Sequence, residues 1–416
     1  MAKKRTKRKS AKRKTSRRKS SRRKGGLSGF LKACKRTQQK LTRAITVIIT
    51  VMVIVLAGYY ALTGTDPLGL FSNTPSSSVP TTVGRGGDWW DVYFTSPSDN
   101  ADPNNLKGSI AEKLIDRIDQ AQSTIHIAAF EFNLTPVAEA LISAQERGVT
   151  VQWVTDDEHG IGADNDEGHG QFTMLKNAGI EIKDDARSAL MHNKFWIFDR
   201  QVVWTGSTNM TVNGNFRNNN NVLVIESPAV AAIYEREFAE LWRGEFGPSS
   251  TSTVSEQKTT VEGTPIQVLF GAEDDVASQL VPLLKSAEQS IHFMAFSFTQ
   301  DEMGMAVQEQ FQTGVEVQGI FEVRGSETEH SELPKQFCSG MAVRQDGNPQ
   351  TFHHKVLIID NQTVVTGSFN FSDNADESND ENVVIITHRE IAAEYQKEFE
   401  RRWREATELD GSEIAC

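Results

Sequence analysis

The chain has 416 residues, 38% of them hydrophobic and 24% charged, an ordinary composition for a globular protein of two or three domains. Its formal net charge of −11 joins two unlike parts. Residues 1–43 contain 20 Lys and Arg and no Asp or Glu, so residues 44–416 hold 24 basic and 55 acidic side chains, a net charge of −31. A body this acidic is a poor electrostatic partner for a polyanion unless a local basic groove overrides it.

The three cysteines give little indication of function. No two of Cys34, Cys338 and Cys416 have the CxxC spacing of a structural zinc site. Cys338 and Cys416 could pair in an oxidising compartment, but the sequence equally allows two free thiols.

The N-terminal part of the chain predicts attachment to a membrane. Residues 1–43 are expected to form a disordered basic tail, because their Lys and Arg clusters recur without apolar periodicity. Residues 44–62 are uncharged and apolar, and as a helix they would be about 28 Å long, close to the thickness of a bilayer core. We therefore expect a single transmembrane helix over residues 44–63, with a cleaved signal peptide as the alternative.

The charge distribution predicts the orientation of this anchor. The positive-inside rule places the basic N-terminus in the cytoplasm and the body that follows on the extracytoplasmic side. The basic tail would then be attracted to anionic lipid head groups. Residues 64–88, which are rich in Gly, Pro, Ser and Thr, are expected to form a stalk between anchor and body.

The body, from residue 89 onward, contains an internal duplication. A helical pattern over residues 106–121 is followed by a buried strand over 124–132, a helix over 136–147 and a strand over 149–154. The same order returns 161 to 166 residues later. Alternating strands and helices predict an α/β sandwich in each repeat. The expected parts are lobe 1 (89–247), a Ser/Thr-rich linker (248–263), lobe 2 (264–408) and a short tail (409–416).

An acidic loop over residues 156–170 interrupts the first repeat. It contains His159 and His169 among Asp and Glu residues, but their spacing fits no calcium or zinc loop motif. We expect a solvated loop at the mouth of a cleft, with a metal site as the less favoured alternative.

One polar pattern occurs in both repeats: HxK, four residues, Asp, six residues, GSxN. The first copy comprises His192, Lys194, Asp199, Ser207 and Asn209, and the second, at a constant offset of 161, comprises His353, Lys355, Asp360, Ser368 and Asn370. The apolar residues between Lys and Asp predict a strand, on which the His and the Lys share one face. Two such pairs would be costly in a core, so they indicate a site. Lys, Ser and Asn suit the binding of a phosphate, and a His can act as nucleophile or general acid.

This paired pattern resembles the signature of the phospholipase D superfamily, over residues 89–407. The resemblance implies two tandem α/β/α sandwich lobes related by a pseudo-twofold axis, with one active site completed within one chain and therefore no obligate dimer. It implies that one His forms a phosphohistidine while the other protonates the leaving alcohol, and that no metal or other cofactor is needed. Water or a second alcohol then accepts the phosphoryl group.

The resemblance also implies roles for the other residues of the motif. Both lysines, with Ser207, Asn209, Ser368 and Asn370, would stabilise the phosphoryl oxygens. Asp199 and Asp360 belong to the signature, but we expect them to brace the strand ends rather than to react.

The two repeats differ 28 residues after each His, where Asn220 follows His192 and Glu381 follows His353. Members of the superfamily often place a carboxylate behind the His, and small bacterial endonucleases of the superfamily have a Glu at this spacing. We therefore expect His192 to be less basic and a weaker nucleophile than His353. Relatives with two motifs commonly use the N-terminal His as nucleophile, so the division of roles stays open.

The substrate class is less well defined by the sequence. The predicted anchor and the acidic body favour a phospholipid, hydrolysed at its head-group phosphodiester. The likeness of the second motif to the endonucleases makes DNA or RNA the alternative. An inactive membrane-anchored binding module is the least favoured hypothesis, because both HxK pairs are intact.

Overall fold

The computed structural model describes residues 84–252, 256–411, 414 and 416. The basic tail, the anchor expected at residues 44–63 and nearly all of the stalk lie outside this part of the chain. Among the residues described, no helix combines the length and the apolar character needed to span a membrane.

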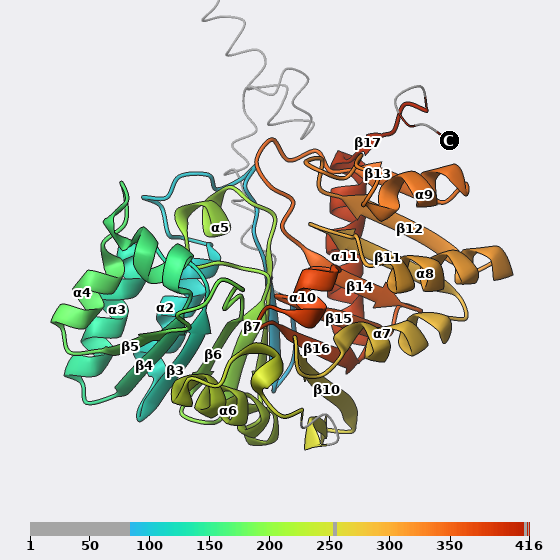
Figure 1. The fold of residues 1–416 in the computed structure, drawn as a ribbon. Coiled ribbons are helices and arrows are strands. Elements are labelled where there is room, and N and C mark those ends of the chain that lie inside the picture. The colour runs from blue at the N-terminus through green and yellow to red at the C-terminus, as the bar shows by residue number, and fades with distance from the viewer. Residues whose placement is uncertain (1–83, 253–255, 412–413, 415) are drawn as a thin grey trace, which may run out of the picture. The chain divides into compact units, whose positions relative to one another are not determined.

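Lobe 1 is built on an eight-stranded sheet with the order β1-β2-β8-β7-β6-β3-β4-β5 (Figure 1). Its strands are β1 (Gly84–Gly87), β2 (Trp90–Phe94), β3 (Thr124–Ala129), β4 (Thr150–Thr155), β5 (Glu181–Asp184), β6 (Lys194–Phe198), β7 (Val202–Gly206) and β8 (Asn221–Glu226). The β3–β4 and β4–β5 pairs are parallel, whereas β6, β7 and β8 form an antiparallel meander. This matches the expected alternation of helices and strands, because a parallel pair needs a crossover such as a helix.

Helices cover both faces of this sheet. They are α2 (Ile110–Gln120), α3 (Thr135–Glu146), α4 (Gln171–Asn177), the short α5 (Val212–Phe216) and α6 (Pro228–Arg243). Alternate residues of β6 point to opposite faces: Trp196 and Phe198 pack with α2, α3 and α4, and Phe195 and Ile197 pack with α6. The acidic loop forms a π-helical turn (Asp157–Ile161) and a 3-10 turn (Gly162–Asn165) before α4.

Lobe 2 repeats this plan on a nine-stranded sheet with the order β17-β13-β12-β11-β14-β15-β16-β10-β9. Its strands are β9 (Lys258–Val261), β10 (Thr264–Phe270), β11 (Ser290–Ala295), β12 (Glu316–Phe321), β13 (Ala342–Gln345), β14 (Lys355–Ile359), β15 (Thr363–Gly367), β16 (Asn382–Thr387) and β17 (Thr407–Glu408). Its helices are α7 (Val276–Lys285), α8 (Asp301–Thr313), α9 (Glu332–Cys338), α10 (Asp373–Glu377) and α11 (Arg389–Glu405).

Two elements of lobe 2 lie in segments expected to be irregular. β9 falls within the predicted linker, where it pairs with β10 and extends the sheet. A 3-10 turn (Gly247–Ser249) precedes it. At the C-terminus, a disulfide joins Cys416 to Cys338 at the end of α9.

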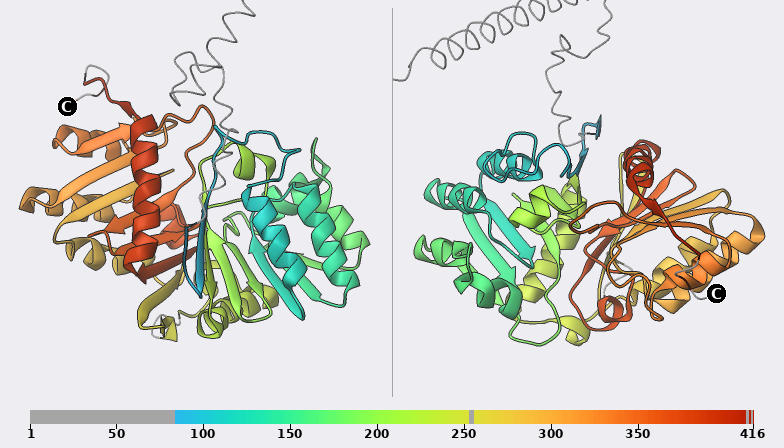
Figure 2. Two further views of the ribbon diagram at one scale, coloured as in Figure 1. Left: turned by 180° about the vertical axis from the view of Figure 1, so that it is seen from behind. Right: turned by 90° about the horizontal axis from the view of Figure 1, so that it is seen from above.

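The two lobes share one apolar core. It contains the inward-facing residues of both sheets together with α6 and α11, so each lobe completes the burial of the other (Figure 2). Within it, Phe195 of β6 and Tyr234 of α6 pack against Phe270 of β10. Burial of apolar surface is the dominant favourable term in such an association.

The Gly of each GSxN motif has a steric function. Gly206 and Gly367 end β7 and β15 with φ values of +149° and +150°, a region that residues with a Cβ rarely adopt. A Cβ at either position would overlap the backbone of the neighbouring strand, at Asn221 or Asn382. The Gly thus brings the following Ser against β8 or β16.

Replacing Gly367 by alanine is therefore expected to lower the free energy of unfolding by roughly 3 kcal/mol or more, through overlap and backbone strain together. Urea denaturation would measure the loss. Gly340→Ala is the matched control, because Gly340 also has a positive φ, +88°, but open space around its Cβ position. Its loss should be about 1 kcal/mol, from backbone strain alone. Equal losses in the two variants would contradict the role of the close approach.

Candidate active site

The two HxK motifs meet where the lobes meet. His192 and His353 lie just before β6 and β14, and each backbone N–H donates to the opposite lobe. His192 donates to the Asp380 carbonyl and His353 to the Asn219 carbonyl, both at 2.9 Å. The contacts thus occur in pairs related by exchange of the lobes, and both histidines are at least nine-tenths buried.

The partners behind the histidines are exchanged between the lobes. His192 Nδ1 lies 2.8 Å from Glu381 Oε2, and His353 Nδ1 lies 2.9 Å from Asn220 Oδ1. The expectation that His192 lacks a carboxylate and that Glu381 supports His353 is therefore wrong. Its cause is the crossing just described: the chain before each strand reaches into the opposite lobe, so each His meets the residue that follows the other motif.

This arrangement favours His192 as the stronger base. The amide oxygen of Asn220 and the Ser207 carbonyl, 3.1 Å away, accept only a proton from His353, which fixes Nδ1 as its N–H. For His192 a carboxylate accepts that proton and stabilises the imidazolium that forms when Nε2 gains a bond. In both rings Nε2 is left as the reacting nitrogen.

The serines of the motifs support these partners. Ser368 Oγ donates to Glu381 Oε2 at 2.6 Å, and Ser207 Oγ donates to Asn220 Oδ1 at 2.8 Å. Both hydroxyls also accept a backbone N–H, from Asn382 and Asn221, and both serines are fully buried. The hydroxyls are thus occupied behind the histidines, and the expectation that they bind phosphoryl oxygens directly is not met.

The lysines are positioned to meet an anion. Lys194 Nζ donates to the His192 carbonyl at 2.9 Å, and Lys355 Nζ donates to the His353 carbonyl at 3.0 Å, which leaves further N–H groups on each ammonium. Burial lowers the pKa of Lys194 to about 8, against the attraction of Glu381. Burial, and then Lys194, lower the pKa of Lys355 well below its usual value. An anion between the lysines would offset this mutual repulsion.

Burial and the lysines also act on the histidines. Burial, then Lys194 and Lys355, lower the pKa of His192 well below its usual value. The same causes, with Lys355 ahead of Lys194, lower the pKa of His353. Both rings are thus neutral at pH 7 in the free protein, as a nucleophile requires. Since each lysine acts on both histidines, the four side chains form one electrostatic unit.

Two phenylalanines complete the site, although the motif did not indicate them. The rings of Phe130 and Phe296 lie edge-on to His192 and His353, each with ring centroids 4.9 Å apart. Lys194 Nζ and Lys355 Nζ lie 5.0 Å and 4.5 Å from the same rings. Their sequence signal was the repeated pair of aromatics after each buried strand, Phe-Glu-Phe and Phe-Ser-Phe.

The last residues of the motifs are placed differently. Asn209 and Asn370 follow the serines, and each has a buried Oδ1 without a hydrogen bond among the described residues. Asp199 and Asp360 lie at the far ends of β6 and β14, where their carboxylates accept backbone N–H groups at the start of β3 and β11. These two carboxylates brace strand ends and are not brought to the histidines.

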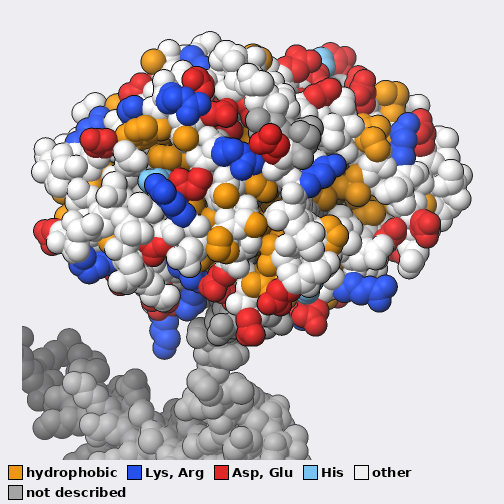
Figure 3. All heavy atoms as spheres, turned by 90° about the horizontal axis from the view of Figure 1, so that it is seen from below, with side chains coloured by type: hydrophobic (Ala, Val, Ile, Leu, Met, Phe, Trp, Pro, Cys, Tyr) orange, Lys and Arg blue, Asp and Glu red, His pale blue; other side chains and the backbone are white. Residues whose placement is uncertain are grey.

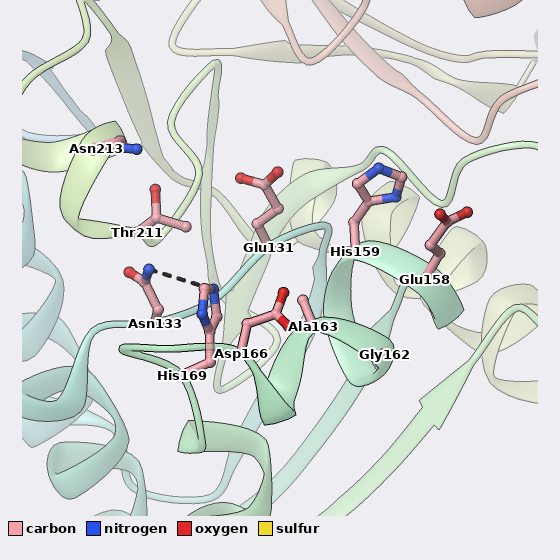
Figure 4. A pocket seen from close by; sticks show the side chains of 10 residues that line it. All are labelled: Glu131, Asn133, Glu158, His159, Gly162, Ala163, Asp166, His169, Thr211 and Asn213. Carbon is pink, nitrogen blue, oxygen red and sulfur yellow. Dashed lines mark hydrogen bonds between the residues drawn. The ribbon is translucent and has the colours of Figure 1, made fainter.

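The acidic loop lines a cavity of about 550 Å³ beside this site (Figure 4). Glu131, His159 and Asp166 point into it, and the His159 ring lies 4.9 Å from that of Phe130, which in turn contacts His192. Glu131 Oε2 also accepts from Asn209 at 3.0 Å. The loop therefore lies next to the reacting groups, as expected for the mouth of a cleft.

The buried titratable groups predict a narrow pH optimum. Burial raises the pKa of Glu381 to about 8, so its carboxylate forms as pH rises, whereas Lys194 loses its charge as pH rises through about 8. Because kcat/KM reports the free enzyme, it is expected to be bell-shaped with a maximum near pH 8. A soluble chromogenic phosphodiester would measure the profile, with circular dichroism to confirm folding at each pH. A level profile would contradict these assignments.

Comparison with known proteins supports the class that this fold and site define. Residues 114–242 and 280–403, more than half of the chain, match the family described as "Cardiolipin synthase, PLD-like domain". The chain belongs to this family and so to the phospholipase D superfamily, as its motifs predicted.

Individual relatives agree with this assignment. The chain is 32% identical over 131 residues to mitochondrial cardiolipin hydrolase of Xenopus tropicalis, covering 32% of this chain and 60% of that protein. It is 30% identical over 202 residues to phospholipase D of Rickettsia bellii, covering 48% of this chain and 94% of that protein. The solved phosphatidylserine synthase of Haemophilus influenzae covers 78% of this chain and 89% of its own, with a TM-score of 0.57 at 13% identity, a likeness of fold alone.

Proposed function

We propose that this chain is a phosphodiesterase of phospholipase D type that hydrolyses the head-group phosphodiester of a phospholipid through a phosphohistidine at His192. One observation carries the proposal: two buried histidines share one site with two lysines, but a carboxylate supports His192 and an amide supports His353. That difference suits one ring to nucleophilic attack and the other to proton transfer.

The first half-reaction follows from this geometry. The phosphodiester binds between Lys194 and Lys355, and its negative charge offsets the repulsion that keeps His353 neutral. His353 thus gains a proton on Nε2 when substrate binds. His192 Nε2 forms a bond to phosphorus as the bond to the leaving alcohol oxygen breaks, and His353 gives its proton to that oxygen. Glu381 stabilises the charge that develops on the His192 ring.

The second half-reaction reverses these roles. Neutral His353 takes a proton from water, the water oxygen forms a bond to phosphorus, and the bond to His192 Nε2 breaks. The products are a phosphomonoester and the free histidine. A second alcohol in place of water would give transphosphatidylation.

Three features support a phospholipid as substrate. The relatives include proteins named cardiolipin hydrolase and phospholipase D. The body carries a net charge of −31, which opposes a polyanionic nucleic acid. On the face seen in Figure 3, Lys and Arg of the described residues are scattered among Asp and Glu and are not gathered in a stripe. The predicted anchor would hold the site near lipid.

The deciding experiment compares substrate classes under metal-free conditions. The purified full-length chain, treated with EDTA, is assayed on vesicles of phosphatidylcholine, phosphatidylglycerol or cardiolipin, and on single- and double-stranded DNA and RNA. Release of phosphatidic acid from vesicles is expected. Cleavage of nucleic acid alone would make the chain a nuclease, and no turnover of any phosphodiester would indicate a binding module.

We also propose that the body lies on the extracytoplasmic side of a membrane. The disulfide between Cys338 and Cys416 supports this location, because such bonds persist in oxidising compartments. Protease added outside intact cells should then digest the body. Protection of the body would contradict this orientation.

A further inference from the structure

The closing helices α6 and α11 carry a buried glutamate at equivalent positions of the duplication, but only one of the two has cationic partners. Glu398 of α11 lies 2.7 Å from Arg402 Nε and 2.7 Å from Arg401 Nη2. Burial opposes ionisation of Glu398, yet Arg402, His354 and Arg401 lower its pKa to about 2. Glu398 is thus a charged carboxylate with matching cations around it.

Glu237 of α6 is the equivalent glutamate and has no such partners. It is only 6% exposed, and no hydrogen bond or ion pair to it is found among the described residues. The positions of Arg401 and Arg402 are occupied in α6 by Glu240 and Leu241. Helix α6 therefore lacks both positive charges and carries one more negative charge. A buried carboxylate in this state is costly unless a cation compensates it.

A third carboxylate reaches the same point from the other lobe. Glu273 lies in the loop between β10 and α7, and oxygens of Glu237, Glu240 and Glu273 lie within 4.8 Å of one another. Asp274 and Asp380 add further negative charge. Burial, and then Asp274 and Glu240, raise the pKa of Glu273 to about 8, which reflects the repulsion within the cluster.

We propose that Glu237, Glu240 and Glu273 bind a divalent cation of the calcium type, which replaces the two arginines of the equivalent junction. Calcium takes carboxylate oxygens at about 2.3–2.6 Å, so ligands of one ion lie up to about 5 Å apart. The cation bridges α6 of lobe 1 to the β10–α7 loop of lobe 2, as Arg402 Nη2 bridges α11 to the Thr95 carbonyl at 2.9 Å. Its role is to hold the lobes together, apart from the reaction.

A second acidic group provides a comparison within the same molecule. Oxygens of Asp156, Asp157 and Asp185 also lie within 4.8 Å of one another. There, however, Arg187 Nε lies 3.4 Å from Asp185 Oδ2, and Asp156 Oδ2 accepts the Met191 N–H at 3.1 Å. This group has its own positive partners, which the cluster around Glu237 lacks.

The test is the effect of Ca²⁺ on thermal unfolding of the EDTA-treated full-length chain. A saturable rise in Tm of about 5 °C is expected, beyond any effect of NaCl at equal ionic strength. Glu237→Gln keeps the size of the ligand but removes its charge, and should abolish the rise. Glu240→Arg copies the other junction, so it should raise Tm without Ca²⁺ and remove the response to Ca²⁺.

Glu245→Gln serves as the control, because Glu245 is exposed and pairs only with Arg243, 2.6 Å away. It should keep the full rise. The proposal is overturned if Ca²⁺ leaves the Tm of the unaltered chain unchanged, or if the rise persists in both Glu237→Gln and Glu240→Arg. Persistence would place the ion elsewhere. Because Glu240→Arg predicts a gain in stability, misfolding of Glu237→Gln would not leave the question open.

Discussion

Replacing His192 by alanine is expected to lower kcat by about 10⁴-fold or more and to prevent any phosphorylated enzyme from forming, because the nucleophile is removed. His353→Ala is expected to lower kcat to a similar extent with natural phospholipids, whose leaving alcohol needs a proton. The two variants should differ with a substrate whose leaving group needs no protonation, such as a nitrophenyl phosphodiester. With it, His353→Ala should still form phosphohistidine but hydrolyse it slowly.

Acid-stable distinction of the two variants is not needed, because phosphohistidine can be trapped by rapid quenching and detected by mass spectrometry under alkaline conditions. The label should lie on His192 and accumulate in His353→Ala. Label on His353, accumulating in His192→Ala, would reverse the roles. Wild-type activity in either variant would contradict a shared site.

The exchange of Glu381 for glutamine should cost about 10²–10⁴-fold in kcat, because an uncharged amide cannot stabilise the imidazolium of His192. The residue at the equivalent position gives a matched control. Asn220→Asp is a change of the same size behind the other histidine, where the native partner is already an amide. It should cost less than about 10-fold, because His353 keeps an oxygen to accept its Nδ1 proton.

The comparison is made at several pH values, with Tm measured for both variants to exclude unfolding. Glu381→Gln should also remove the acid limb of the kcat/KM profile, since that limb belongs to the Glu381 carboxylate. Equal losses for Glu381→Gln and Asn220→Asp would mean that the two histidines are not distinguished by the groups behind them.

Much of the fold could be predicted because the duplication is visible along the chain. A constant offset of 161 residues between His192 and His353, and between their serines and asparagines, fixed which segments are equivalent. The Gly-Ser pair also signalled a close approach of backbone. Local patterns of this kind depend only on neighbours in sequence.

Contacts between the lobes could not be predicted in the same way. Glu381 was assigned to His353 because the two are 28 residues apart, yet it lies behind His192, 189 residues away. Nothing in the local pattern shows that the segment before β6 crosses to the other lobe. The serines were assigned to phosphate for a similar reason: their composition suits an anion, but their burial behind the histidines depends on the packing of β7 and β15.

The apolar core shared by the lobes has a consequence for how the site could become unequal. Two identical subunits would present every side chain twice, so a glutamate behind one histidine would also stand behind the other. Joining the halves in one polypeptide lets each position vary alone, and Glu381 and Asn220 differ in this way. Covalent linkage also keeps the halves together on dilution, so activity per molecule should not depend on protein concentration. Division of labour between the histidines and independence from concentration thus share one origin.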